Sequence, residues 1–265
     1  MKLQTLAAAI DQTDHALVEK LNIQTDALIG NQCSRTGTET FSYHGHQVTY
    51  LHAAERGVGK NRNRLLECAE GDFLILADDD MRFVDGYPAI AAQAIEACAD
   101  ADVYIFNLIE RSPRRYVNRA VKRVGRREYA RYGAARLMLR RASIERAGLR
   151  FSLEFGGGAR YGSGEDTIFL RDCLDKGLKL YAVPYALAEI DQEAPSSWFT
   201  GYNETFFRDK GALYACLHPR IWPVMAIRFL LVHRKRFQGG LPLRDAVRAM
   251  LSGGHAYAAE KRGRA

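Results

Sequence analysis

Apolar residues recur along the first hundred positions in two alternating patterns. Short continuous apolar runs predict buried strands, and longer segments with one apolar face predict helices. The expected strands are Lys2–Ala8, Ala27–Gly30, Gln47–Leu51, Phe73–Ala77 and Val103–Asn107. The expected helices are Asp14–Leu21, Asn61–Glu70 and Pro88–Ala99. Strands that alternate with helices in this way indicate an α/β fold, with a mostly parallel central sheet flanked by helices.

The pattern is less regular in the middle of the chain. The Arg-rich segment Ser112–Tyr132 has no clear period, and we expect a loop or a surface helix there. The elements expected after it are a strand at Ala135–Arg140, helices at Ser143–Ala147 and Asp166–Lys176, and a strand at Leu178–Val183 that Pro184 ends.

The C-terminal part has the composition of a helical, basic extension. The apolar run Ile221–His233 precedes three basic residues, and a second apolar-faced segment, Ala246–Tyr257, is interrupted by two glycines. The first run is too short to span a bilayer, which needs about 20 apolar residues. It fits a helix in the plane of an anionic membrane surface, with Trp222 and Phe229 inserted, and it fits a buried helix equally well. We expect a main domain at residues 1–218 and the extension at 219–265.

Positive charge is concentrated in two stretches, although the net charge of the whole chain is only +7. Residues 111–150 hold fourteen Arg or Lys against two Glu, and residues 220–265 hold ten against one Asp and one Glu. Such stretches indicate an anionic partner (nucleic acid, anionic lipid or a diphosphate-bearing substrate) unless they are simply solvated. The five cysteines form no Cys-x-x-Cys pair, and Lys2–Ile10 predicts a strand and not a signal peptide, so we expect a cytoplasmic protein.

Three adjacent carboxylates, Asp78, Asp79 and Asp80, directly follow the expected strand Phe73–Ala77. Carboxylates about 5 Å apart repel each other by roughly 3 kcal/mol at an effective dielectric constant of about 20. A hard divalent cation such as Mg²⁺ or Mn²⁺ relieves this repulsion, because such ions prefer oxygen ligands. The cluster therefore predicts a metal site or, in the simpler case, a solvated acidic turn.

Five short motifs occur in an order that resembles bacterial family 2 glycosyltransferases. Their donor half has a G-x-x-x-x-R-N run, an A-x-G-D/E turn and a strand that ends in D-x-D, and their acceptor side has an E-D helix with a K-G-x-K exit. The matching segments are Glu55–Asn63, Ala69–Asp72, Leu76–Asp80, Gly164–Arg171 and Lys176–Lys179. Each motif alone is weak, but their order and spacing agree from about residue 1 to about residue 200.

The resemblance implies a GT-A (Rossmann-like) fold, a nucleotide-diphosphate-sugar donor and Mn²⁺ or Mg²⁺. Asp78 would contact the nucleotide ribose and help to hold the metal, and Asp80 would bind the metal that bridges the diphosphate. Asp79 fills the middle position of the motif. Arg62 and Asn63 open a helix whose N-terminus favours an anion, and Arg62 would add positive charge toward the diphosphate. An ordinary helix start would explain both residues as well.

The chain departs from the family pattern near the expected nucleotide base. Where the family usually has an acidic pair after the second strand, this chain has Asn31 and Gln32, whose amides can both donate and accept at a uracil or guanine edge. After the first strand, where Pro-x-Tyr-Asn is frequent, the chain has Ala8–Gln12. The identity of the base stays open.

Sugar transfer needs a group that takes the proton of the attacking hydroxyl. Asp166 is the expected base, because the helix N-terminus keeps a carboxylate deprotonated, and Glu165 beside it is expected to point elsewhere. The two residues could also simply cap a helix. A single displacement of this kind inverts the anomeric centre.

The acceptor is expected to be a saccharide or a polyprenyl-diphosphate-linked sugar in cell-surface polysaccharide synthesis. Gly157 and Gly158 lie in a glycine-rich segment suited to a loop that closes over a substrate. Trp198 could stack on a sugar face, although a core role is equally plausible. A lipid-linked acceptor would place the protein at the inner face of the plasma membrane.

Two alternatives belong to other classes of protein. One is a sugar-nucleotide-binding module without catalysis. The other is a basic nucleic-acid-binding protein, which the residues 111–150 suggest; however, the chain has no helix-turn-helix, zinc or aromatic-platform signature, and this alternative leaves the acidic motifs unexplained. We therefore expect no nucleic-acid partner.

Overall fold

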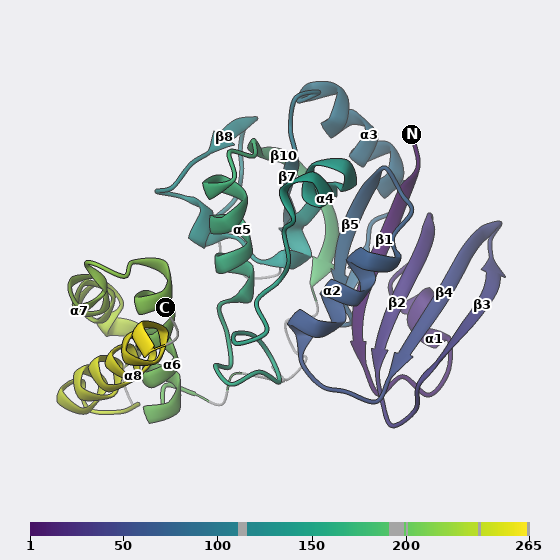
Figure 1. The fold of residues 1–265 in the computed structure, drawn as a ribbon. Helices are drawn as coiled ribbons and strands as arrows, with labels where there is room; N and C mark the ends of the chain where they lie inside the picture. Colours follow the sequence, from purple (N-terminus) through teal and green to yellow (C-terminus); the bar gives the residue numbers. More distant parts are fainter. Residues whose placement is uncertain (111–115, 191–198, 200, 238–239, 264–265) are drawn as a thin grey trace. The chain divides into compact units, whose positions relative to one another are not determined.

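The computed structural model describes the chain except for residues 111–115, 191–198, 200, 238–239 and 264–265 (Figure 1). The chain divides into two compact units. The first comprises Met1–Ser152 and Asp166–Pro195, and the second comprises Leu153–Glu165 and Ser196–Ala265. The division falls near residue 195 and not at the expected boundary of 218, because helix α6 (Glu204–Leu217) packs with the C-terminal helices.

The first unit is built around a ten-stranded sheet with the order β3-β4-β2-β1-β5-β9-β7-β10-β6, and β8 pairs with β10. The strands are β1 (Leu3–Ile10), β2 (Asp26–Gln32), β3 (Gly37–Tyr43), β4 (His46–Ala53), β5 (Phe73–Asp78), β6 (Met81–Phe83), β7 (Val103–Ile109), β8 (Lys122–Val124), β9 (Leu137–Arg140) and β10 (Leu180–Ile190). The helices are α1 (Ala16–Lys20), α2 (Val58–Cys68), α3 (Tyr87–Ala97), α4 (Arg141–Ala147) and α5 (Glu165–Asp175).

The predicted α/β sheet is confirmed, although it is mixed and only loosely described as mostly parallel. β4, β2, β1 and β5 run parallel to one another, as do β7 and β10. β9 enters between β5 and β7 and is antiparallel to both. An apolar run looks the same in either direction along a strand, so the pattern in the sequence does not show which way a strand runs.

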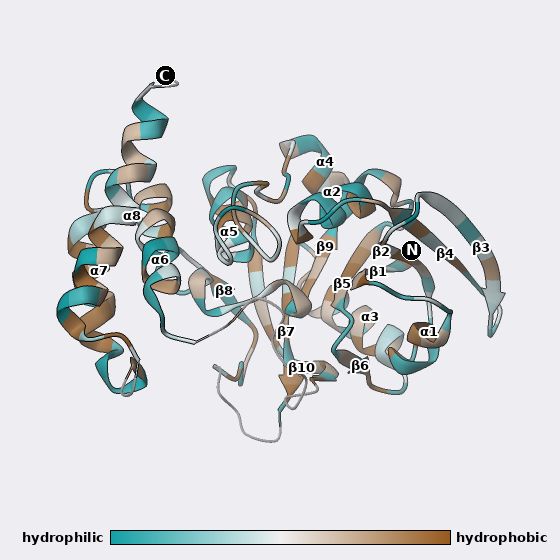
Figure 2. Cartoon of the chain, turned by 90° about the horizontal axis from the view of Figure 1, so that it is seen from below, coloured by the Kyte–Doolittle hydropathy of each residue, from teal (hydrophilic) through white to brown (hydrophobic). Residues whose placement is uncertain are grey.

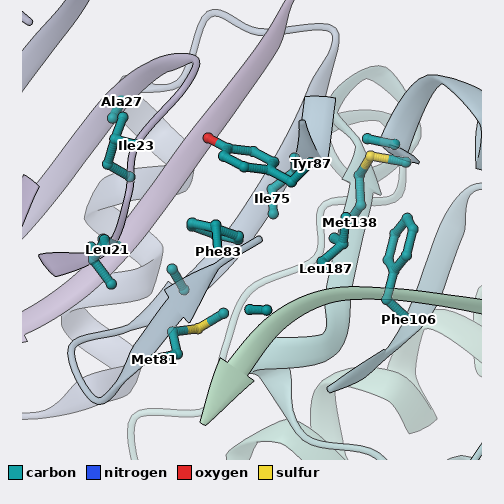
Figure 3. Packing of buried hydrophobic residues seen from close by; sticks show 14 of the residues in the cluster. Leu21, Ile23, Ala27, Ile75, Met81, Phe83, Tyr87, Phe106, Met138 and Leu187 are labelled. Atoms are coloured by element: carbon teal, nitrogen blue, oxygen red, sulfur yellow. The ribbon is translucent and has the colours of Figure 1, made fainter. Parts of the chain in front are cut away.

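Helices cover both faces of the sheet, as predicted. One core lies under α1 and α3 and includes Leu21, Ile75 and Tyr87, which Figure 3 labels among the side chains of this cluster. The other core lies under α2, α4 and α5 and includes Leu65 and Phe169. Central strands are therefore buried on both sides, which explains their continuous apolar sequence.

Two local predictions need correction. β10 continues through Pro184 to Ile190, because its pairing with β7 is irregular between Ala182 and Ala186, and a proline there costs no regular ladder hydrogen bond. β3 was not expected from the sequence, because it is an edge strand with no fully buried residue and therefore lacks an apolar run.

The second unit contains α6, α7 (Trp222–Val232), a short 3₁₀ turn at Arg234–Phe237 and α8 (Leu243–Gly263). α8 is continuous, so the prediction that Gly253 and Gly254 interrupt it is wrong. The two glycines instead allow close packing. A Cβ atom at Gly253 would lie 2.1 Å from the carbonyl oxygen of Arg208 in α6, and one at Gly254 would lie 2.3 Å from the ring of Trp222 in α7.

Among the described residues, no helix combines the length and the apolar character that crossing a membrane requires.

Candidate functional site

The parallel strands of the first unit bring several polar residues to one edge of the sheet. Ile10 pairs with Gln32, and Gln32 pairs with Ala53, while Ala8 pairs with Asp78. The carboxyl ends of β1, β2, β4 and β5 therefore meet at the same edge. Ligands of open α/β sheets bind at this edge.

Arg62 on α2 is the central positive charge of this edge. Its side chain is only 6% exposed. Nη2 donates a hydrogen bond of 2.7 Å to Oδ1 of Asp78, and Nη1 donates one of 2.7 Å to Oδ1 of Asp166. The guanidinium also lies 5.3 Å from the ring centre of Phe151. Arg62 thus joins the strand-end carboxylate to the carboxylate at the start of α5.

The start of α2 is held close to the rest of the unit. Gly57 precedes the helix with φ of 126°, a conformation that favours glycine. Gly59 in the first turn passes so near Ser152 that a Cβ atom would lie 2.1 Å from the Ser152 carbonyl oxygen. This close approach allows the side chain of Arg62 to reach both carboxylates.

Asp166 is fixed by both of its oxygens. Oδ1 accepts from Arg62, and Oδ2 accepts a 3.0 Å hydrogen bond from the backbone N–H of Ala134. A carboxylate has about four lone-pair sites, so these two bonds orient Asp166 and leave it able to accept a further proton donor.

Asp79 and Asp80 form the rest of the acidic cluster. Oδ2 of Asp79 accepts a 3.2 Å hydrogen bond from the backbone N–H of Ile10, and Nζ of Lys20 donates to the Asp79 carbonyl oxygen at 2.6 Å. Burial raises the pKa of Asp79 above its usual range. Burial, with repulsion from Asp78 and Asp79, raises the pKa of Asp80 to about 6. Burial and mutual repulsion therefore both disfavour the ionised forms of Asp79 and Asp80.

The described side chains alone do not form a complete set of metal ligands. No group of three His, Cys, Asp or Glu side chains that could bind a metal exists among the described residues. Mg²⁺ typically uses one or two carboxylates plus substrate phosphates, and Asp80 with the second oxygen of Asp78 would provide such a pair. The pKa of Asp80 is raised first by burial and then by the neighbouring carboxylates Asp78 and Asp79, and a bound cation would oppose both effects. The donor set thus fits an ion that is shared with a diphosphate.

Asn31 and Gln32 differ in what their side chains can still bind. Asn31 is fully buried: Oδ1 accepts from the backbone N–H of Gln12, and Nδ2 donates to the Gln12 carbonyl oxygen and to Nδ1 of His52. Its amide therefore shapes the loop after β1. Gln32 is also buried, and its Oε1 atom has no hydrogen-bond partner among the residues that the structure describes. A buried acceptor without a donor is costly, so Gln32 is the better candidate for a ligand N–H.

Asn63 is occupied by the protein backbone. Its Nδ2 donates to the carbonyl oxygen of Phe151 at 2.9 Å, and its Oδ1 accepts from the Phe151 N–H at 2.7 Å. The structure thus brings Arg62 to the acidic cluster and turns Asn63 to the chain that follows α4.

Three expected site residues belong to the second unit. Oε2 of Glu165 accepts a 3.1 Å hydrogen bond from the N–H of Gly164. Gly157 and Gly158 lie in a turn that the N–H of Gly156 closes by donating to the carbonyl oxygen of Tyr161 at 2.8 Å. Trp198 lies outside the described residues.

His52 and the pair of Asp11 and Arg56 also lie at this edge, and no motif in the sequence marked them as site residues. His52 is buried beside Asn31 at the end of β4, and the only signal for it was its place directly after the expected strand Gln47–Leu51. Nη2 of Arg56 lies 2.8 Å from both carboxylate oxygens of Asp11, and Nη1 donates to the Gln32 carbonyl oxygen. These contacts position the loop after β1 next to Asn31 and Gln32, the residues expected near the nucleotide base.

The sheet, with an acidic cluster at its carboxyl edge, defines an open α/β protein of the kind that binds ligands at that edge. The family model described as "Glycosyl transferase family 2" matches residues 4–151, which is more than half of the chain. The chain therefore belongs to glycosyl transferase family 2, and it is a glycosyltransferase by family, as the motifs predicted.

Solved structures share the fold. The crystal structure of Staphylococcus aureus TarS residues 1–349 in complex with UDP-GlcNAc is 15% identical, with a TM-score of 0.61 over 89% of this chain and 73% of that one. The complex of the same protein with UDP is 15% identical, with a TM-score of 0.59 over 97% of this chain and 83% of that one. These likenesses confirm the predicted GT-A fold. The comparison with curated proteins found no match.

Proposed function

We propose that the protein transfers a sugar from a nucleotide-diphosphate sugar to an acceptor hydroxyl with inversion of the anomeric centre. The observation that carries this proposal is the double hydrogen bond of Arg62 to Asp78 and Asp166. One guanidinium links the carboxylate expected on the donor side to the carboxylate expected to activate the acceptor. The similar TarS structures hold UDP-GlcNAc and UDP, which supports a nucleotide-sugar donor here.

The donor would lie along the carboxyl edge of the sheet. Asp78 at the end of β5 would accept from the ribose hydroxyls, with its Oδ1 kept in place by Arg62. The buried Oε1 of Gln32 would accept from an N–H of the base, as uracil and guanine both offer on their Watson–Crick edges. Asn31 would keep the β1 loop in shape and would not itself contact the base.

Asp80 and Asp78 would hold Mn²⁺ or Mg²⁺ together with the diphosphate. When bound, such an ion neutralises the charge of the departing diphosphate. Arg62 adds a fixed positive charge at the same edge, and Asp79 is engaged with the backbone of Ile10.

Asp166 would act as the general base. Its carboxylate is held in one orientation by Arg62 and by the N–H of Ala134, so a free lone pair can be aimed at an incoming hydroxyl. As the hydroxyl oxygen attacks the anomeric carbon, its proton passes to Asp166 and the bond to the diphosphate breaks on the opposite side. Glu165 is the alternative base.

The acceptor would be a saccharide or a polyprenyl-diphosphate-linked sugar used in cell-surface polysaccharide synthesis. Gly157, Gly158 and Trp198 remain proposed acceptor contacts. A lipid-linked acceptor would place a cytoplasmic protein at the inner face of the plasma membrane.

The test is a thermal-shift panel of UDP-, GDP-, CMP- and dTDP-sugars, each with and without Mn²⁺. We expect the sugars of one nucleotide to raise the melting temperature of the protein, and Mn²⁺ to increase this shift. With that donor and an acceptor, NMR should then detect a product with inverted anomeric configuration. Binding without turnover toward any acceptor or water would identify a non-catalytic sugar-nucleotide module. A panel without effect, together with salt-dependent binding to DNA, would favour the nucleic-acid alternative.

A further inference from the structure

Helix α7 carries a row of apolar side chains that the other described residues of the second unit leave exposed. Val224 and Leu231, two turns apart, are 66% and 63% exposed. Ile221, Ile227 and Val232 are exposed around them, and Figure 2 shows hydrophobic colour along this helix. At 100° per residue these positions fall on one face of the helix.

The opposite face of α7 makes the core contacts of the second unit. Trp222 is only 5% exposed and packs against Gly254 and the ring of His255. Phe229 is half-buried, and its ring contacts those of Tyr214 and Phe237. The expectation that Trp222 and Phe229 insert into a membrane is therefore wrong, because both face the neighbouring helices.

Exposed positive charges adjoin the apolar row. Arg228 lies on the row itself, and Arg234, Lys235 and Arg236 follow α7 directly. Between residues 221 and 237 the sequence has no Asp or Glu. None of these four cations forms an ion pair with an acidic residue that the structure describes. Lys261 on α8, by contrast, is neutralised by Glu154 at 2.7 Å.

We propose that this face of α7, the "α7 surface" made of Ile221, Val224, Ile227, Leu231 and Val232 with the adjoining basic residues, docks on an anionic membrane surface. The helix would lie in the plane of the interface, with its apolar row among the acyl chains and its cations at the headgroups. A second copy of the chain is a poorer occupant, because a symmetric contact would place the same uncompensated cations against one another.

Vesicle co-sedimentation of the full chain tests the proposal. We expect the protein to pellet with vesicles of phosphatidylcholine mixed with phosphatidylglycerol, to stay in solution with phosphatidylcholine alone, and to dissociate as salt rises. A protein that remains in the supernatant with the anionic vesicles at low salt overturns the proposal.

A matched pair of variants locates the surface. Val224→Ser/Leu231→Ser should weaken binding to the anionic vesicles by about tenfold or more, because it removes the centre of the apolar row. Leu153→Ser is the control, since Leu153 is an exposed apolar residue of the same unit outside α7. Equal losses in the two variants would contradict the assignment to α7.

The charges are tested separately. Arg234→Gln/Lys235→Gln/Arg236→Gln should weaken vesicle binding and reduce its dependence on salt, while Arg248→Gln, which removes an Arg paired with Asp245 on α8, should change little.

Light scattering without lipid should show a monomer. A dimer that the Val224→Ser/Leu231→Ser change dissociates would identify a second copy as the occupant. The thermal shift caused by nucleotide sugars should be the same in all these variants, which separates this proposal from the proposed catalysis.

Discussion

Oδ1 of Asp166 accepts a 2.7 Å hydrogen bond from Nη1 of Arg62. The two residues are 104 positions apart in the sequence, and Arg62 is almost fully buried. Because the same guanidinium also binds Asp78, the fold needs Arg62 in order to place two negative charges near each other. The contact therefore serves both stability and the proposed chemistry.

Replacing Arg62 by Met should destabilise the protein by about 2–3 kcal/mol, because it leaves the half-buried carboxylates of Asp78 and Asp166 without their charged hydrogen-bond donor. Chemical denaturation measures the free energy of unfolding. The control is Arg56→Met, since Arg56 and Asp11 form an exposed ion pair whose loss should cost about 1 kcal/mol or less. Similar losses in both variants would show that the Arg62 bridge contributes nothing special to stability.

Asp166→Asn should lower turnover by on the order of 10²–10⁴ and leave donor affinity nearly unchanged, since the amide keeps the shape but cannot take a proton. Steady-state kinetics and donor titration calorimetry separate the two effects. Asp175→Asn, at the other end of α5, is the control. Normal turnover in Asp166→Asn, with a loss in Glu165→Gln, would move the base to Glu165.

Asp80→Asn should abolish the part of donor affinity that depends on Mn²⁺, because it removes a charged ligand of an ion shared with the diphosphate. Isothermal titration with and without Mn²⁺ measures this difference. Asp79→Asn should retain most of the metal dependence, since Asp79 is bound to the backbone of Ile10. An unchanged metal effect in Asp80→Asn would refute the metal assignment.

The same substitution should stabilise the protein without ligand. The pKa of Asp80 rises from 3.8 to about 6 in the folded chain. The folded chain holds the Asp80 proton more tightly than the unfolded chain does. The contribution of Asp80 to the free energy of unfolding is therefore fully present below its pKa in the unfolded chain. It is lost as the pH rises through its pKa in the folded chain. With EDTA present, Asp80→Asn should therefore gain about 1–2 kcal/mol at pH 7, after allowance for solvent screening, and little at acid pH. If Asp80→Asn is less stable than the parent at pH 7, the ionised Asp80 carboxylate does not destabilise the folded chain as described.

Gly254→Ala should destabilise the second unit by about 1–3 kcal/mol, because the added methyl group meets the ring of Trp222. Gly263→Ala in the same helix is the control, since a Cβ atom there meets nothing within 4 Å. Thermal unfolding followed by circular dichroism compares the two variants. If both behave like the parent, Trp222 is not packed against α8 in the way described.

Local sequence patterns predicted the elements that are buried on both faces. β5 and β7 appeared as apolar runs at Phe73–Ala77 and Val103–Asn107, whereas α2 begins at Val58, three residues before its predicted start at Asn61. A strand that is buried on both faces of a sheet consists of consecutive apolar residues, so it can be predicted from a single sequence. The edge strand β3 is half solvated and left no such trace.

The basic stretch at residues 111–150 shows what composition cannot reveal. Several of its cations form ion pairs with acids from distant parts of the chain: Arg126 with Asp175, and Arg150 with Glu67. Its local excess of charge is therefore partly neutralised within the fold. A count of charges within one stretch of sequence includes only residues that are close along the chain. Tertiary packing also brings acidic residues from distant segments next to these cations.

The sequence by itself determined which residue types stand at the ends of the strands and helices, and through them the family and the fold class. Only the tertiary structure decided which of those residues meet. Arg62 lies between Asp78 and Asp166 because α2 packs closely against the chain near Ser152, and Asn31 faces Gln12 and His52 because β1, β2 and β4 end in register. Contacts of this kind depend on helix and strand positions set by packing over the whole unit, and no short stretch of sequence contains that information.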